Sequence, residues 1–344
     1  MTTDLFPADQ WERLSAAEAG WSAAKLERVR DWLATSGEGA YRLAIVHRGR
    51  LVFEWYQSLE AEVHRPIASA AKSIYSNVLG IAVAEGVLPS VDAPVVDYFP
   101  EMMDVPQGRG PKEGRYAFAK DEAITFRQLI SNTSGYMKPD EEPGRVFHYQ
   151  TYGMNILTHA VAKAYGLYDV ADPEGGPGFA RLVADKLAAP IGADWSYTAT
   201  NFSLQEGANL PVFGYYCQIH TQPLDWLRLG WLWCNGGRWG DKQVIPTDWL
   251  AESTAVEGAI LAHCPEDEWQ YGCGFWTNSH GKLWPGLPRS GFTASGAGGH
   301  YLTVFPEQEL VVAQNPGLYI KDESGSTAGA NQILLTLLLD AAAG

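Results

Sequence analysis

The chain has 344 residues, of which 46% are hydrophobic and 12% aromatic, enough to bury the core of an enzyme-sized unit. Its formal net charge of −15 disfavours nucleic acid and anionic membrane surfaces as partners, because acidic surfaces repel phosphate. The sequence predicts no secretory signal, and no stretch reaches the roughly 20 apolar residues of a membrane span. Four cysteines without CxxC spacing indicate reduced thiols, so we expect a cytoplasmic protein.

Helical and strand patterns alternate in the first part of the chain. Apolar residues at helical spacing predict a helix over Ser22–Ser36. Two strand-like runs then predict a hairpin, Arg42–His47 with Leu51–Tyr56. The next predicted helix, Ser69–Ala84, is apolar nearly all round, so we expect it to be buried.

The central part of the chain has a mainly helical pattern. Thr125 and Gln128 resemble a capping box, and Gly135 is the predicted stop of the helix that they begin. Further helices are predicted over Thr151–Tyr165, Phe179–Ala188 and Leu224–Cys234.

The strand period returns near the end of the chain. It predicts strands over Gly272–Trp276, His300–Phe305 and Glu309–Gln314, and a closing helix over Thr327–Ala343.

This order of elements predicts an α+β fold. Residues 1–75 and 262–344 are expected to share one antiparallel sheet, flanked by the N- and C-terminal helices. Residues 76–261 are expected to form a mainly helical lobe inserted between them. A functional site in the crevice between the two lobes is the expected geometry.

The pattern Ser-x-x-Lys occurs twice, at Ser22–Lys25 and at Ser69–Lys72. Positions i and i+3 of a helix share a face, so a lysine kept neutral by burial can take the proton of a serine in the first turn. Charged residues follow the first copy, which indicates a solvated helix capped by Ser22. The apolar helix favours the second copy, for which the alternative is a helix cap and a lysine whose amine reaches solvent.

Several short motifs follow one another in a characteristic order. They are Gly20–Leu26, Ile67–Ser73, Ala84–Leu88, Val95–Glu101, Leu129–Gly135, Phe147–Tyr149, Asn235–Gly237, Gly298–Gly299 and Phe305–Glu307. With them, the chain resembles the class C β-lactamase-like serine hydrolases, of the β-lactamase/penicillin-binding-protein type, from about residue 20 to 316. Over Asp225–Trp249 and Tyr271–Trp276 it looks closest to 6-aminohexanoate-dimer hydrolases and family VIII carboxylesterases.

The resemblance implies a β-lactamase/transpeptidase-like fold with Ser69 as nucleophile and Lys72 as its base. The second motif of that family is Tyr-x-Asn, whose tyrosine relays protons with the lysine; here it is Tyr149-Gln150-Thr151. Thr151 stays a candidate substrate contact, although a hydroxyl offers fewer hydrogen bonds than an amide. The alternative for Tyr149 is a core aromatic residue at the start of a helix.

The third motif of β-lactamases, Lys-Thr-Gly, matches Ala294–Gly296, so the lysine is missing. That cation helps β-lactamases and DD-peptidases to hold a substrate carboxylate, which makes those activities less expected here. The backbone role remains, and the N–H groups of Ser69 and Ala297 are the expected oxyanion hole. The alternative is a glycine-rich turn before a strand. Candidate substrate contacts in this segment are Ser295, Gly296, Gly298 and His300.

Other residues complete the set of candidates. Trp276 and His148 are further candidate substrate contacts, and Trp233, Trp269 and Trp284 are pocket walls or core residues. The eight histidines have no metal-binding spacing, and no Gly-x-Ser-x-Gly elbow is present, so no metal or cofactor is expected.

Together these patterns predict a serine hydrolase, an esterase or amidase, that cleaves a small uncharged ester or amide through an acyl-enzyme on Ser69. No nucleic acid or membrane partner is expected, and a homodimer stays open. Two alternatives remain: an acyltransferase that uses the same acyl-enzyme, and a non-catalytic binding protein on the same fold. The Asn-to-Thr and Lys-to-Ala changes in the motifs motivate the second alternative.

Overall fold

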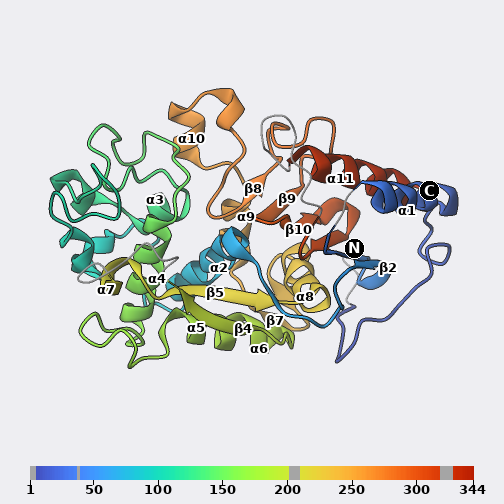
Figure 1. Ribbon diagram of the computed structural model, residues 1–344, viewed down its shortest axis with the longest axis horizontal. Coiled ribbons are helices and arrows are strands. Elements are labelled where there is room, and N and C mark those ends of the chain that lie inside the picture. The colour runs from blue at the N-terminus through green and yellow to red at the C-terminus, as the bar shows by residue number, and fades with distance from the viewer. Residues whose placement is uncertain (1–4, 37–38, 201–209, 318–327) are drawn as a thin grey trace.

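The computed structural model describes residues 5–36, 39–200, 210–317 and 328–344. A six-stranded antiparallel sheet, in the order β2-β1-β11-β10-β9-β8, combines strands from both ends of the chain (Figure 1). These strands are β1 (Tyr41–His47), β2 (Arg50–Gln57), β8 (Trp276–Thr277), β9 (Phe292–Gly296), β10 (His300–Phe305) and β11 (Leu310–Gln314).

Helices cover both faces of this sheet, which explains why every residue of β1 is buried. Successive side chains of a strand point to opposite faces. Leu43 and Ile45 accordingly join the cluster formed with α1 (Ala23–Thr35) and α11 (Ala328–Ala342), which lie side by side in Figure 1. The alternate residues of β1 face the larger core, which includes α8 (Pro223–Cys234) and α2 (Ala71–Ala84).

The middle of the chain holds most of the helices and a second sheet. This sheet has three antiparallel strands in the order β3-β5-β4, with β3 directly before the turn that carries Ser69. Its strands are β3 (Arg65–Pro66), β4 (Ser196–Thr200) and β5 (Tyr216–Thr221), and a small hairpin pairs β6 (Arg238–Trp239) with β7 (Lys242–Gln243). The helices are α3 (Phe126–Ile130), α4 (Tyr152–Ala164), α5 (Gly178–Val183), α6 (Ala189–Ile191), α7 (Leu210–Phe213), α9 (Thr247–Ser253) and α10 (Gly258–His263).

The predicted α+β fold is confirmed: both ends of the chain contribute strands to one antiparallel sheet with α1 and α11 packed on it. The division at residues 75 and 262 stays a prediction. Thr125 and Gln128 do form a capping box. None of the described helices has the length and apolar character needed to cross a membrane.

Several expected elements were wrong. The helix after Thr125 ends at Ile130 instead of Gly135. The expected strand Gly272–Trp276 is reduced to β8, because Gly274 takes a φ of +85° and turns the chain. The sequence analysis missed β4 and β5, which pair with each other. It also gave no strand bounds for β9, of which it matched Ala294–Gly296 to a family motif and left a glycine-rich turn as the alternative.

Close packing of α8 on the sheet depends on Gly230. A Cβ atom there would lie 2.3 Å from Val311 Cγ1 and 2.9 Å from Leu302 Cδ1, both on the sheet. We expect Gly230→Ala to lower the free energy of unfolding by about 1–3 kcal/mol, because overpacking forces the sheet and helix apart. Urea denaturation measures this change.

The matched control is Gly258→Ala in α10, where a Cβ atom would meet nothing within 4 Å. We expect this variant to keep or raise the free energy of unfolding, by up to about 1 kcal/mol, because alanine favours helix over glycine. Equal stability of the two variants would contradict the packing argument.

Candidate active site

Ser69 lies in a short 3₁₀ turn, Ala68–Ala70, that leads directly into α2. Ala68 has a φ of +50°, a backbone region that costs free energy for a residue with a Cβ atom and persists only where its surroundings enforce it. The Ile67 N–H donates to the Ile219 carbonyl of β5 at 3.0 Å, which ties the turn to the second sheet. Ser69 itself stays partly exposed while Ala70 is buried, so the turn presents the hydroxyl to the surface.

Strand β9 ends against this turn. A Cβ atom on Gly296 would lie 2.1 Å from the Ile67 carbonyl oxygen and 3.0 Å from the Ala70 nitrogen. Only glycine allows this approach. Ala297 follows in an exposed turn, so the end of the first sheet and the Ser69 turn are adjacent.

Lys72 is fully buried on the first turn of α2, and its Nζ donates a hydrogen bond to Ser69 Oγ at 3.0 Å. No carboxylate of the described residues forms an ion pair with it. Burial penalises the ammonium form and lowers the pKa of Lys72 to about 7. A substantial fraction of the amine is therefore neutral near neutral pH and can accept a proton.

The segment of Cys273–Phe275 closes over Lys72 from the other side. Ser73 Oγ donates to the Gly274 carbonyl at 2.6 Å. A Cβ atom on Gly274 would lie 2.7 Å from the Lys72 carbonyl oxygen. This segment therefore packs directly on the backbone of the first turn of α2.

Tyr149 reaches the same place from the loop before α4. Lys72 Nζ lies 4.7 Å from the centroid of its ring. Burial raises the pKa of Tyr149 to about 12, and a hydrogen bond with Ser69 partly opposes this shift. The phenol thus keeps its proton at neutral pH, while Ser69, Lys72 and Tyr149 lie in mutual contact.

An aromatic cluster surrounds Tyr149. Its ring lies 5.8 Å from that of Tyr271 at 89° and 5.7 Å from that of Trp276. The Phe147 ring packs against that of Tyr271 at 5.2 Å with a tilt of 38°. Rings at these separations pack favourably and exclude water. Trp276 is the tryptophan candidate that contacts Tyr149.

The remaining candidates for substrate contacts lie around this centre. Thr151 is the half-buried N-cap of α4, and Ser295 is half-buried on β9. Gly298 lies in the turn after β9, where a Cβ atom would be 3.2 Å from His300 Nε2. His148, next to Tyr149, contacts Lys138 and Glu141.

His300 is buried at the start of β10. Burial, together with the nearby Arg65 and Arg42, lowers its pKa to about 4. The imidazole is therefore neutral at physiological pH.

Two of the tryptophan candidates are core residues. Trp233 is buried with its Nε1 donating to Asn77 Oδ1 at 2.8 Å. Trp284 is buried against Phe305 in the cluster under α1 and α11. Trp269 lies at the edge of the Tyr271 cluster.

The first Ser-x-x-Lys copy has a structural role. Ser22 caps α1 by accepting a hydrogen bond from the Lys25 N–H. Lys25 pairs with Asp340 of α11 at 3.0 Å. The first copy therefore caps α1 and forms an ion pair between α1 and α11.

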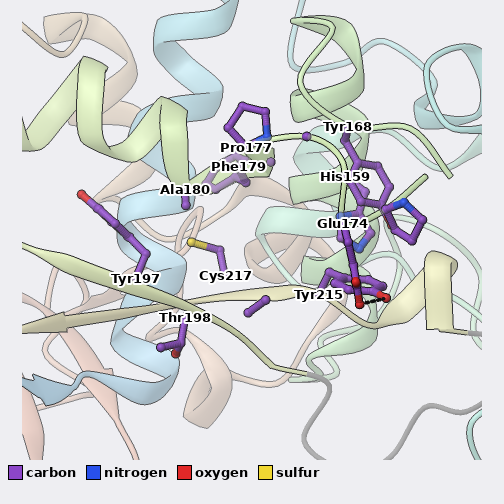
Figure 2. A pocket seen from close by; sticks show the side chains of 14 residues that line it. His159, Tyr168, Glu174, Pro177, Phe179, Ala180, Tyr197, Thr198, Tyr215 and Cys217 are labelled. Atoms are coloured by element: carbon purple, nitrogen blue, oxygen red, sulfur yellow. Dashed lines mark hydrogen bonds between the residues drawn. The ribbon is translucent and has the colours of Figure 1, made fainter.

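A cavity of about 350 Å³ lies beside β4 and β5 (Figure 2). Tyr75 of α2 packs against Phe179 of its lining and also against Tyr216. The described lining residues include neither Ser69 nor Lys72 nor Tyr149. The cavity is therefore separate from the reactive centre.

The sequence analysis did not single out Asn132 or Tyr271. Asn132 is buried with a φ of +58° and bonds to the chain on both sides of Tyr149. Its only signal was its place in the motif Leu129–Gly135, and asparagine is one of the few residues that tolerate a left-handed backbone.

We compared the chain with protein families, curated proteins and solved structures. The β-lactamase family model matches residues 29–206, just over half of the chain. No curated protein matches the sequence.

Three solved structures share the fold at low sequence identity. A proposed β-lactamase from Bacteroides dorei is 18% identical, with 94% of this chain and 100% of that chain covered and a TM-score of 0.68. A proposed 6-aminohexanoate-dimer hydrolase from Bacillus anthracis is 14% identical, with 99% and 88% covered and a TM-score of 0.66. A family VIII carboxylesterase is 18% identical, with 94% and 98% covered and a TM-score of 0.65. With its family model matched over more than half its length and its fold shared, this chain belongs to the β-lactamase family.

Proposed function

We propose that the protein is a serine hydrolase that cleaves a small uncharged ester or amide through an acyl-enzyme on Ser69. One observation carries the proposal: a buried lysine without an acidic partner among the described residues donates to the Ser69 hydroxyl at 3.0 Å. A lysine so placed is a ready general base for a serine nucleophile. Membership in the β-lactamase family supports it, since members of that family are serine hydrolases of esters and amides.

The first half of the reaction forms the acyl-enzyme. Ser69 Oγ attacks the carbonyl carbon while the neutral Lys72 amine takes its proton. The N–H groups of Ser69 and Ala297 hold the negative oxygen of the tetrahedral intermediate. The close approach of β9 to the Ser69 turn at Gly296 supports this pairing of two backbone donors.

The second half releases the products. Tyr149 passes a proton to the leaving group and recovers one from the Lys72 ammonium. A water molecule then attacks the acyl carbon and frees Ser69. The pKa of Tyr149, raised to about 12, favours the phenol as proton donor and leaves the base role to Lys72.

The chemistry of the substrate follows from the third motif and the aromatic cluster. Where β-lactamases have a lysine for the substrate carboxylate, this chain has the buried Ala294. The half-buried Phe147 and Trp276 instead supply apolar surface beside Tyr149. The carboxylesterase and the 6-aminohexanoate-dimer hydrolase among the similar structures agree with an ester or amide substrate.

Removal of the nucleophile provides the most direct check. We expect Ser69→Ala to lower the turnover of p-nitrophenyl esters by roughly a thousandfold or more, because the variant lacks the hydroxyl on which the acyl-enzyme forms. The same variant should no longer be labelled by a fluorophosphonate probe. Ser22→Ala is the control, since Ser22 only caps α1; it should keep full activity. Unchanged turnover in Ser69→Ala would reject the proposal.

The pH dependence of kcat/KM should report Lys72. The base must be neutral, so activity is lost as the pH falls through the pKa of about 7 and is fully present above it. We expect kcat/KM to fall about tenfold per pH unit below pH 7, with no second loss up to pH 10, because the pKa of Tyr149 is about 12. A profile flat from pH 5 to 9 would contradict the role of Lys72.

A further inference from the structure

Asn132 holds the chain on both sides of Tyr149. The His148 N–H donates to the Asn132 carbonyl oxygen at 2.9 Å. The Gln150 N–H donates to Asn132 Oδ1 at the same distance. Because Asn132 is only 1% exposed, water does not compete for these bonds, and the backbone of Tyr149 is fixed between two anchored neighbours.

A third bond extends this control to the ring of Tyr149. Asn132 Nδ2 donates to Tyr271 Oη at 3.3 Å. The Tyr271 ring in turn stands edge-on to the Tyr149 ring. One side chain thus holds both the backbone of Tyr149 and the ring that packs against it, while its own hydrogen bonds go to neither Ser69 nor Lys72.

We propose that Asn132 is a positioning residue that keeps the Tyr149 hydroxyl aimed at the leaving group, so that it decides how well unactivated esters and amides are cleaved. This inference rests on the function proposed above. It concerns one proton transfer in that reaction and one class of substrate.

The proton transfer in question occurs when the tetrahedral intermediate collapses. The bond from the carbon to the leaving oxygen or nitrogen breaks, and its electron pair stays on that atom. The Tyr149 Oη–H proton moves to the same atom, and Tyr149 takes a proton from the Lys72 ammonium. That proton is the one that Lys72 received from Ser69, so the charges balance without any further reactant.

The need for this proton depends on the leaving group. A p-nitrophenolate is stable in water at neutral pH and can leave without a proton. An alkoxide is strongly basic and needs one as the bond breaks. A misaligned Tyr149 therefore slows the cleavage of an alkyl ester much more than that of a p-nitrophenyl ester, whereas general damage to the site slows both equally.

The experiment compares kcat/KM of Asn132→Gly for p-nitrophenyl butyrate and for ethyl butyrate, which share one acyl group. Glycine accepts the φ of +58° without strain and keeps the carbonyl bonded to His148, so only the side-chain bonds are lost. We expect a loss of less than about fivefold on the p-nitrophenyl ester and of about a hundredfold on the ethyl ester, within the range of general acid catalysis. Tyr149→Phe should show the same selective loss.

Two further variants make the test specific. Glu309→Gly, at another left-handed position with a φ of +48°, is the matched control and should leave both esters unchanged. Tyr271→Phe removes the hydroxyl that accepts from Asn132 Nδ2, and we expect it to lose activity on the ethyl ester selectively.

Fluorophosphonate labelling separates the outcomes, because fluoride leaves without a proton. Labelling of Asn132→Gly near the wild-type rate, together with the selective loss, supports the inference. Equal losses on both esters, or a variant active on both, would overturn it. If Ser69→Ala also stayed active, the proposed function itself would fail; if Ser69→Ala is inactive, that function stands and only the role of Asn132 is rejected.

Discussion

The desolvation of one amine is the interaction on which the candidate site depends. Lys72 has no exposed surface, and its pKa of about 7 results from burial alone. A lysine side chain in water has a pKa of about 10.4. It is therefore protonated at neutral pH and cannot accept a proton from a serine. The fold removes water from this amine, and no carboxylate of the described residues pairs with it. The amine is thereby available to Ser69, at a cost in stability that other packing must offset.

Much of the surrounding structure serves to exclude that water. The segment at Gly274 closes on the Lys72 backbone, and the ring of Tyr149 covers the amine. Around Tyr149, a second layer of aromatic rings raises the pKa of the phenol. The same apolar surroundings shift the two groups in opposite directions, since burial disfavours the charged form of each. The result is a neutral base and a neutral acid side by side.

The large sheet contributes through the close approach of backbones. The ends of β9 and of the Ser69 turn come from segments more than 200 residues apart in sequence, yet glycine at position 296 lets them meet within van der Waals distance. Gly230 likewise brings α8 against Val311, on the face of the sheet that borders the larger core. Both contacts depend on the absence of a side chain, and the first of them brings β9 to the Ser69 turn.

The amino-acid sequence by itself determined the local features. The spacing of apolar residues predicted the bounds of seven elements to within one or two residues, because each has a continuous apolar face. These elements are α1, β1, β2, α4, α8, β10 and β11. The apolar character of the helix after Ser69 also distinguished the buried Lys72 from the half-buried Lys25, because a helix that is apolar nearly all round must be covered by other elements.

The features that depend on contacts between distant segments could be known only from the tertiary structure. Strand β5 lies between β4 and β3, and β3 comes from far earlier in the chain. The expected strand before Trp276 is lost because Gly274 must turn toward Lys72. The burial of Trp233 and Trp284 in the core likewise depends on which elements pack together. So do the hydrogen bonds of Asn132 to the residues on either side of Tyr149. Periodicity records how one segment meets its immediate environment, whereas hydrogen bonds and ring contacts between distant segments exist only once the chain has folded.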